Sequence, residues 1–191
     1  MKIIALLAGA GLVVIASCAG PVPSVHHATW PSASPSASPS GIVILSDPGH
    51  VTGRIPSGCH ARGPLPDPGC TPGGTDPVVS GATIDRTICI RGYTSTVRPP
   101  QSETSRTKRS MYAAYGIPDG TVSELDHLIP LELGGNNDTA NLWPEVGRIP
   151  NPKDLVENAL RAAVCTHLIT LDMAQTAIAA DWTTARSRLG V

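Results

Sequence analysis

The sequence predicts a small single α+β domain carried behind an exported leader, and three observations support this prediction. One continuous apolar run lies at the N-terminus, over residues 3–16. A stretch rich in Pro, Ser and Gly follows it. Helix and strand patterns are concentrated after residue 78. The 191 residues therefore hold one ordinary domain and are too few for two sizeable ones.

Charge and composition exclude two classes of protein. The formal net charge of -1 excludes a strongly basic protein that coats nucleic acid over its whole surface, although a local basic patch remains compatible with it. Only one segment is continuously apolar, which excludes a membrane channel. The chain has no Phe, so we expect a core built from Leu, Ile, Val and Ala.

The N-terminus has the pattern of a signal peptide. Lys2 precedes an apolar run of about 14 residues, shorter than the ~20 that span a bilayer. Residues 15–18 (IASC) resemble a bacterial lipobox, so we expect a lipoprotein signal peptide over residues 1–17 and lipidation of Cys18. Ordinary cleavage nearby, with Cys18 free or discarded, is the alternative. Both predict export, either to the outer face of the cell membrane on a lipid anchor or into the medium, with no transmembrane helix in the mature protein.

The next segment is expected to be an extended tether. Residues 18–58 are dominated by Pro, Ser and Gly, including a Pro-Ser-Ala-Ser repeat over residues 31–40, and such a composition predicts disorder. The apolar residues 42–45 are either a short strand or no regular element. Residues 59–77 are expected to be a loop held to the domain by disulfides, and residues 78–191 the folded domain.

Four cysteines follow Cys18, at positions 59, 70, 89 and 165. An even number in an exported chain predicts disulfides, and four cysteines allow three pairings. Sequence alone does not choose between them, although proximity favours Cys59 with Cys70 and leaves Cys89 with Cys165. Zinc binding is the rival interpretation, but no CxxC is present and the spacings fit no zinc finger.

Local patterns predict one strand and three helices. Residues 84–90 alternate as a strand would. A helix is expected from Ser102 or Thr104 to Tyr115, stopped by Gly116. A second helix opens at Asn151, with that residue as N-cap, and a third covers residues 171–188. The second and third helices each have one apolar stripe, made by these residues: Val156, Leu160, Ala163, Val164; Leu171, Ala174, Ile178, Trp182.

A compact non-helical segment between the first two helices contains the reactive residues. A short apolar run delivers adjacent Asp126 and His127, a Gly-Gly-Asn-Asn-Asp turn at residues 134–138 reverses the chain, and a second strand presents Asn141. We expect a hairpin here, with the helix from Asn151 packing across it.

A hairpin followed by a helix, with Asp-His on one strand and Asn on the other, resembles the ββα-metal (His-Me) finger of HNH endonucleases. The phrases DHLIPLELGG (126–135), NLWPE (141–145) and NPKD (151–154), with residues 87–99, are similar to a group of exported, HNH-like proteins of actinobacterial type. The resemblance covers roughly residues 59–189 and implies an HNH-like nuclease domain over residues 78–191.

The chemistry of phosphodiester hydrolysis suits these residues. A neutral His127 can accept a proton from the attacking water. Asp126 can ligate a divalent metal, most readily Mg²⁺, with Mn²⁺ or Zn²⁺ as alternatives. Adjacent residues on a strand point to opposite faces, so both serve one site only if the strand ends or bulges there. The resemblance implies that Asn141 positions the loop and the His127 backbone.

The third metal ligand is less clearly marked. Asn151 is one candidate, and its alternative role is that of an N-cap. Glu157, later on the same helix, is the second candidate. Lys153, near the helix start, is predicted to contact phosphate, and a solvated side chain is the alternative.

One segment of the chain is locally basic. Six basic side chains and a single acidic one lie between residues 86 and 109: Arg86, Arg91, Arg98, Arg106, Lys108, Arg109 and Glu103. Such a segment beside a metal finger is expected of a protein that binds a phosphate backbone. Arg98, in the family-like phrase TVRP, is the best candidate for a phosphate contact; a solvated helix face is the alternative for the last three basic residues.

The resulting hypothesis is a metal-dependent HNH-type endonuclease that hydrolyses DNA or RNA outside the cytoplasmic membrane with little sequence preference. The alternative is a catalytically degenerate HNH-fold module that binds nucleic acid or an envelope partner without cutting. A structural envelope lipoprotein is a third possibility. The sequence leaves the oligomeric state open.

Overall fold

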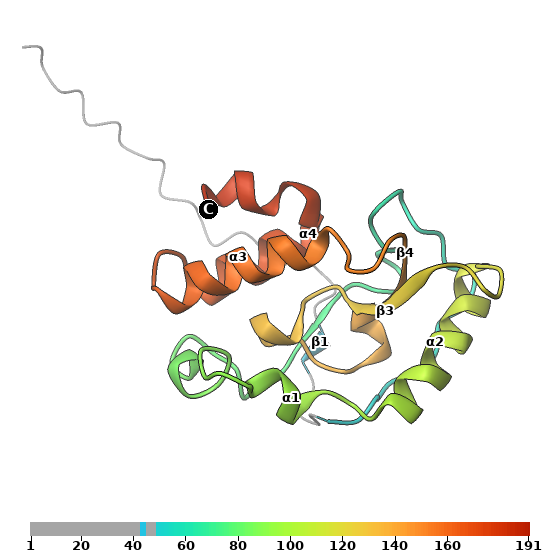
Figure 1. Cartoon of the computed structure of the whole chain (residues 1–191), viewed down its shortest axis with the longest axis horizontal. Coiled ribbons are helices and arrows are strands. Elements are labelled where there is room, and N and C mark those ends of the chain that lie inside the picture. The colour runs from blue at the N-terminus through green and yellow to red at the C-terminus, as the bar shows by residue number, and fades with distance from the viewer. Residues whose placement is uncertain (1–42, 45–48) are drawn as a thin grey trace, which may run out of the picture. The chain divides into compact units, whose positions relative to one another are not determined.

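The computed structural model describes residues 43–44 and 49–191, and within them helices and strands are mixed in an α+β arrangement (Figure 1). This confirms the predicted fold class. The expected signal peptide (1–17) and the expected lipidation site at Cys18 lie outside the described residues. The strands and helices follow in this order: β1 (Val43–Ile44), β2 (Gly74–Thr75), α1 (Tyr93–Val97), α2 (Gln101–Tyr115), β3 (Ser123–His127), β4 (Leu142–Val146), α3 (Lys153–Cys165), α4 (Leu171–Leu189).

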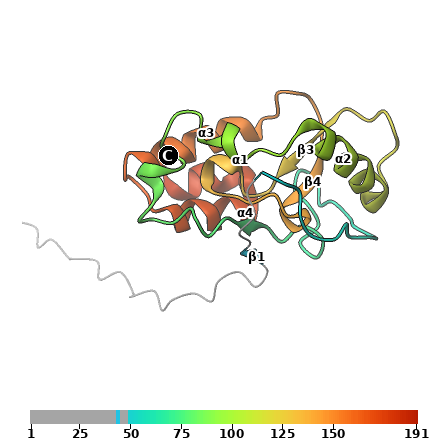
Figure 2. The same ribbon diagram turned by 90° about the horizontal axis from the view of Figure 1, so that it is seen from below.

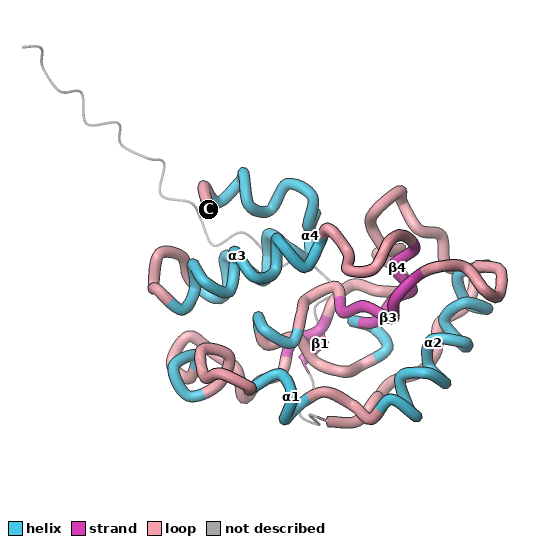
Figure 3. Tube along the Cα trace, viewed as in Figure 1, coloured by secondary structure: helices cyan, strands magenta, loops and turns pink. Residues whose placement is uncertain are grey.

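An antiparallel hairpin of β3 and β4 lies at the centre of this arrangement. Its register pairs Ser123 with Val146 and His127 with Leu142. The connection between the strands contains two 3-10 turns, η2 (Leu131–Leu133) and η3 (Thr139–Asn141). Figure 3 shows how much of the chain around the two strands, drawn in magenta, is loop. The hairpin predicted around Asp126, His127 and Asn141 is therefore present, with Asn141 immediately before β4.

Different helices lie on the two sides of the hairpin. In both views α2 lies on one side, and α3 and α4 on the other (Figure 1 and Figure 2). Helix α2 contacts both strands, whereas α3 packs mainly on α4 and on η2. The expectation that the helix after Asn151 would pack across the hairpin is therefore corrected. Its apolar stripe faces α4, and its N-terminal end alone approaches the end of β3.

Several helix limits follow the predicted signals, but the predicted start of α2 is wrong: the helix begins at Gln101 after Pro100, with no side-chain cap from Ser102 or Thr104. Helix α2 ends at Gly116, whose φ of 64° is the left-handed conformation that glycine adopts readily. Helix α4 begins after Thr170, whose hydroxyl accepts the Met173 N–H at 3.2 Å. Asp181 has non-helical backbone angles inside α4, and the helix resumes after it.

The strand predicted over residues 84–90 is wrong. The segment is a 3-10 turn (Ile84–Arg86) continued by further turns. Ile84 and Ile88 are buried four residues apart, whereas Ile90 is 52% exposed. The buried positions thus follow a helical spacing, and the apparent alternation of apolar residues did not reflect one buried face.

Order begins earlier than the predicted tether boundary at residue 58. Thr52 donates its N–H to the Asn137 carbonyl at 3.2 Å, and its carbonyl accepts the Thr139 N–H at 3.0 Å. The Thr139 hydroxyl donates to the Arg54 carbonyl at 2.8 Å. Residues 52–54 therefore lie along the turn that joins β3 to β4, and the Val51 N–H donates to Glu103 of α2 at 3.0 Å. The sequence left open whether residues 42–45 form a short strand, and residues 43–44 do form strand β1.

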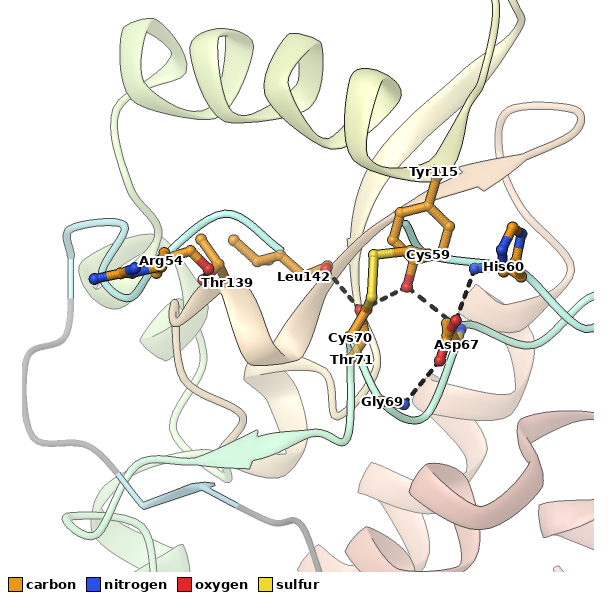
Figure 4. The surroundings of a disulfide bond; sticks show 10 residues. All are labelled: Arg54, Cys59, His60, Asp67, Gly69, Cys70, Thr71, Tyr115, Thr139 and Leu142. Carbon is orange, nitrogen blue, oxygen red and sulfur yellow. Dashed lines mark hydrogen bonds between the residues drawn. A yellow bond between two sulfur atoms is a disulfide. The ribbon is translucent and has the colours of Figure 1, made fainter. Parts of the chain in front are cut away.

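Both disulfides that proximity favoured are present, Cys59–Cys70 and Cys89–Cys165. The first holds a loop against the end of α2 and the start of β4 (Figure 4). The Tyr115 hydroxyl lies 2.8 Å from the Thr71 hydroxyl, which donates to the Leu142 carbonyl at 3.1 Å. This disulfide and these hydrogen bonds therefore hold residues 59–71 against the domain, and β2 follows at residues 74–75.

The hydrophobic core lies between the α3–α4 pair and the loop that follows β3. Aliphatic side chains from both regions, joined by one from the turns at residues 84–90, meet there without solvent contact: Ile129, Leu133, Leu160, Ile178 and Ile88. Burial of each such side chain stabilises the fold by roughly 1.5–3 kcal/mol. Because Ile129 and Leu133 follow His127 closely, the same core fixes the loop that carries the candidate site.

Candidate functional site

His127 is the last residue of β3, and its ring is anchored on one side. Its Nε2 lies 2.9 Å from Oδ1 of Asn137, whose Nδ2 donates to the Val97 carbonyl at 2.8 Å. Since the Asn137 amide nitrogen is the donor to Val97, its oxygen is the acceptor, and Nε2 must carry the ring proton. In the neutral ring Nδ1 is then left as an acceptor, which is the form that a general base requires.

Burial keeps the His127 ring neutral. The side chain is 7% exposed, and burial lowers its pKa to about 4, although the hydrogen bond to Asn137 and the nearby Asp126 act in the opposite direction. The ring is therefore uncharged at neutral pH.

Asn141 clamps the loop that follows His127. Its Oδ1 accepts the Ile129 N–H at 2.9 Å, and its Nδ2 donates to the carbonyls of Ile129 and Asn136 at 2.9 and 2.8 Å. Its backbone carbonyl also accepts the Leu128 N–H at 2.8 Å. Asn141 is fully buried, so its side chain holds the loop that follows His127 and is not accessible from solvent.

Two glycines allow the turn to close on this clamp. Gly134 has a φ of 74°. Gly135 is required for a different reason, because a Cβ there would lie 1.7 Å from the Ile129 carbonyl oxygen. Any side chain at Gly135 would push the loop away from Asn141.

The hairpin register places Asp126 and His127 on opposite faces. Directly paired residues share a face, so Asp126 lies with Trp143, and His127 with Leu142. His127 ends the strand and lines a pocket on each side of it, of about 470 Å³ and about 300 Å³. Asp126 and His127 can serve one site only if the strand ends or bulges beside them, and β3 does end at His127.

The two pockets differ in charge. Arg98 and Lys108 line the larger pocket, which lies against α2. The smaller pocket lies against α3 and is lined by these acidic residues: Glu124, Asp126, Glu132, Asp154, Glu157. Arg98 lines both pockets, as His127 and Glu124 do, and its side chain is exposed to solvent. The predicted phosphate-binding arginine therefore lies beside the imidazole.

Lys153 has a different environment from the predicted one. It is 1% exposed, and its Nζ donates to the His127 carbonyl at 2.7 Å, lies 2.8 Å from Asp126 Oδ2 and contacts Glu157 Oε1. Burial alone would lower the pKa of Lys153, but the two carboxylates outweigh it and raise that pKa above its usual value. A buried ammonium with three partners does not contact phosphate, and this corrects the prediction.

The predicted metal ligands do not form an open metal site. Asn151 Oδ1 accepts the Lys153 N–H at 3.1 Å and so caps α3, the alternative that the sequence left open. Asp126 and Glu157 are joined through the Lys153 ammonium. Within residues 49–191, no group of three or more His, Cys, Asp or Glu side chains is placed to hold a metal ion. A divalent cation does not fit between these carboxylates while Lys153 lies there.

Two important side chains were missed at the sequence level. Asn137 looked like an ordinary turn residue, and only the fold shows that it fixes the His127 ring. Glu145 is buried beside Asp126, and burial, reinforced by that carboxylate, raises the pKa of Glu145 to about 9. No pattern in the sequence distinguishes either residue from its neighbours.

Comparisons with protein-family models, with curated proteins and with solved structures found no match to this chain. Both disulfides fit an exported protein. Over the part of the chain that is described, no helix has the length and apolar character needed to cross a membrane.

Proposed function

We propose that this protein is an exported phosphodiesterase that acts on DNA or RNA, with His127 as its general base. The observation that carries the proposal is the placement of the His127 ring. Its Nε2 is held by Asn137, its carbonyl accepts from Lys153, Asn141 holds the loop that follows it, and its side chain lines pockets that Arg98 also lines. A neutral imidazole held by a second residue next to an exposed guanidinium is the arrangement that general-base attack on a phosphodiester needs.

The proposed reaction is a hydrolytic displacement at phosphorus. Arg98 binds a non-bridging phosphate oxygen and stabilises the negative charge that develops there. His127 takes a proton on Nδ1 from a water molecule as the water oxygen bonds to phosphorus. The bond from phosphorus to the leaving oxygen breaks, and that oxygen takes a proton from solvent. The sequence shows no pattern for reading base edges, so we expect cleavage with little sequence preference.

The resemblance to HNH endonucleases, including the reading of β3, β4 and α3 as a ββα finger, belongs to this proposal. The resemblance also implies a divalent metal, most readily Mg²⁺. The residues present do not fit that ion, because Lys153 joins Asp126 to Glu157. No step of the proposed reaction is therefore assigned to a metal.

Export on a lipid anchor completes the proposal. A signal peptide over residues 1–17 and lipidation at Cys18 would hold the domain on the outer face of the cell membrane, with the Pro/Ser-rich segment as a spacer. The membrane is then contacted through the anchor, and nucleic acid is met outside the cytoplasm.

A binding module without catalysis is the second candidate. The observation in its favour is the ion pairing of Asp126 and Glu157 with Lys153, which leaves the HNH-like arrangement without an open metal site. Arg98 and Lys108 would still present positive charge to a phosphate backbone.

A nuclease assay separates the two candidates. The full chain, with its disulfides oxidised, is incubated with plasmid DNA, single-stranded DNA and RNA in Mg²⁺, Mn²⁺, Zn²⁺ or EDTA. We expect cutting that disappears in His127→Ala. Binding of the same nucleic acids without cutting in any buffer, by a folded sample, would favour the binding module.

A further inference from the structure

The Lys153 ammonium has the surroundings of a bound cation. Three oxygen atoms from three residues contact it: the carbonyl of His127 and carboxylate oxygens of Asp126 and Glu157. Carbonyl and carboxylate oxygens are also the ligands that Mg²⁺, Mn²⁺ and Ca²⁺ take in proteins. The oxygens are thus of the kind that binds a divalent ion, and an amino group of the chain lies among them.

We propose that Lys153 is a built-in cation that replaces a divalent metal at this site, and that these oxygens bind a divalent ion only when the ammonium is removed. The claim that these oxygens bind a divalent ion once the ammonium is removed does not depend on the function of the protein. The claim that Lys153 replaces a catalytic metal rests on the proposed phosphodiesterase function.

The backbone of α3 fixes Lys153 in this position. Lys153 is the first residue of α3, and Asn151 caps that helix by accepting the Lys153 N–H. Its side chain is almost wholly enclosed, so solvent does not compete for the ammonium. Glu157 lies one helical turn later and contacts the ammonium from the same helix, whereas Asp126 approaches from β3.

Electrostatics opposes a second cation beside Lys153. A divalent ion sharing Asp126 or Glu157 would lie within a few ångströms of the ammonium, where like charges repel strongly in a buried site. Removing the ammonium abolishes this repulsion. The two neighbouring carboxylates are then left without a counter-charge and attract a cation. The site therefore accepts either the lysine or a metal.

Lys153 also connects the acidic side of the hairpin to the reactive imidazole. Its bond to the His127 carbonyl holds the end of β3, and its pairing with Asp126 neutralises the carboxylate next in sequence to His127. A metal bound by Asp126 would perform the same two tasks. In the proposed phosphodiesterase, activity should accordingly survive the removal of divalent ions.

Titration of the full chain with Mn²⁺, followed by calorimetry and by electron paramagnetic resonance, tests the binding part. Four proteins are compared: wild type, Glu157→Gln, Lys153→Ala and the double variant Lys153→Ala with Glu157→Gln. We expect no stoichiometric binding to wild type and one Mn²⁺ bound by Lys153→Ala with a Kd of roughly 0.1–1 mM, as at weak oxygen sites. The double variant should bind at least tenfold more weakly, because it lacks one carboxylate.

Two results would overturn the proposal: one Mn²⁺ bound by the wild type and weakened by Glu157→Gln, or a folded Lys153→Ala that binds none. If Lys153→Ala is unfolded in metal-free buffer, circular dichroism during Mn²⁺ addition decides. Refolding of that variant alone, and not of the double variant, supports the proposal, and failure to refold overturns it.

The nuclease assay separates failure of this inference from failure of the proposed function. Cutting by the wild type that persists in EDTA supports both proposals. Cutting that EDTA abolishes keeps the phosphodiesterase and overturns the built-in cation. If nothing is cut, the phosphodiesterase fails, and the Mn²⁺ titration still decides the binding part.

Discussion

The two sides of the β3–β4 hairpin handle charge in opposite ways. On the α2 side, Arg98 and Lys108 line an accessible pocket beside His127. On the α3 side, acidic groups surround one enclosed ammonium, that of Lys153. Two adjacent residues of one strand therefore lie in different environments. The His127 ring is uncharged, whereas the Asp126 carboxylate is ion-paired with the Lys153 ammonium. In the proposed phosphodiesterase, the α2 side binds the substrate and the α3 side holds the end of β3 in place.

Replacing His127 tests whether the reactive group lies between these two sides, and we expect this change to have the largest effect. His127→Gln keeps an N–H donor for Asn137 but has no basic nitrogen. We expect kcat for DNA hydrolysis to fall about 10²–10⁴-fold, the usual contribution of a general base, with little change in DNA affinity. Single-turnover cleavage and fluorescence anisotropy measure the two quantities. An unchanged kcat would show that another group takes the proton.

Removing the buried ammonium tests the α3 side. Lys153→Met keeps an apolar chain of similar length and leaves Asp126 and Glu157 without a partner. We expect the free energy of unfolding at pH 7 to fall by about 3–5 kcal/mol, as when one member of a buried ion pair is removed. Guanidinium unfolding with the disulfides intact measures it.

The matched control for Lys153 is the exposed pair of His167 and Asp85, in which Nε2 of the histidine lies 3.7 Å from Oδ1 of the aspartate. Asp85→Asn should leave the free energy of unfolding nearly unchanged, because exposed ion pairs are screened by water. An equally small effect for Lys153→Met would mean that the α3 side does not depend on its lysine.

The low pKa of His127 predicts acid sensitivity. The unfolded chain takes up the His127 proton near pH 6.5, whereas the folded chain does so only near pH 4. Between pH 6.5 and pH 4 the unfolded chain therefore binds a proton that the folded chain does not. The free energy of unfolding is unaffected by this residue above pH 6.5 and falls by roughly 3 kcal/mol as the pH is lowered to 4. Urea unfolding of wild type and His127→Gln between pH 4 and 7 measures the difference. If the two proteins lose stability in parallel, burial does not keep the ring neutral.

Removing Arg98 tests the basic side and should have the smallest effect. Arg98→Ala should weaken the binding of single-stranded DNA uniformly across sequences and lower the salt dependence of log K by roughly 0.7, the value of one phosphate contact. Anisotropy titrations at several salt concentrations measure this change. Arg188→Ala, in the last turn of α4, is the control and should behave as wild type. Equal effects of the two changes would remove Arg98 from the binding surface.

Local signals predicted much of the fold. Gly116 ended α2, Asn151 capped α3, and the turn at residues 134–138 joined two strands. These features depend on neighbours within a few residues, which is why a sequence pattern reveals them. Proximity also favoured the observed disulfide pairing. The pattern failed over residues 84–90, where burial against distant helices, and not alternation, decided the conformation.

The sequence by itself determined the α+β class, the hairpin that carries Asp126 and His127, and the four cysteines that form disulfides. It favoured their pairing without deciding it. Tertiary structure alone decided what these residues meet. The Lys153 side chain became a buried partner of Asp126 because α3 begins beside the end of β3, and Asn137 fixed the His127 ring because the turn folds back against Val97. Protonation states follow from burial and from charges distant in sequence, so no local pattern specifies them.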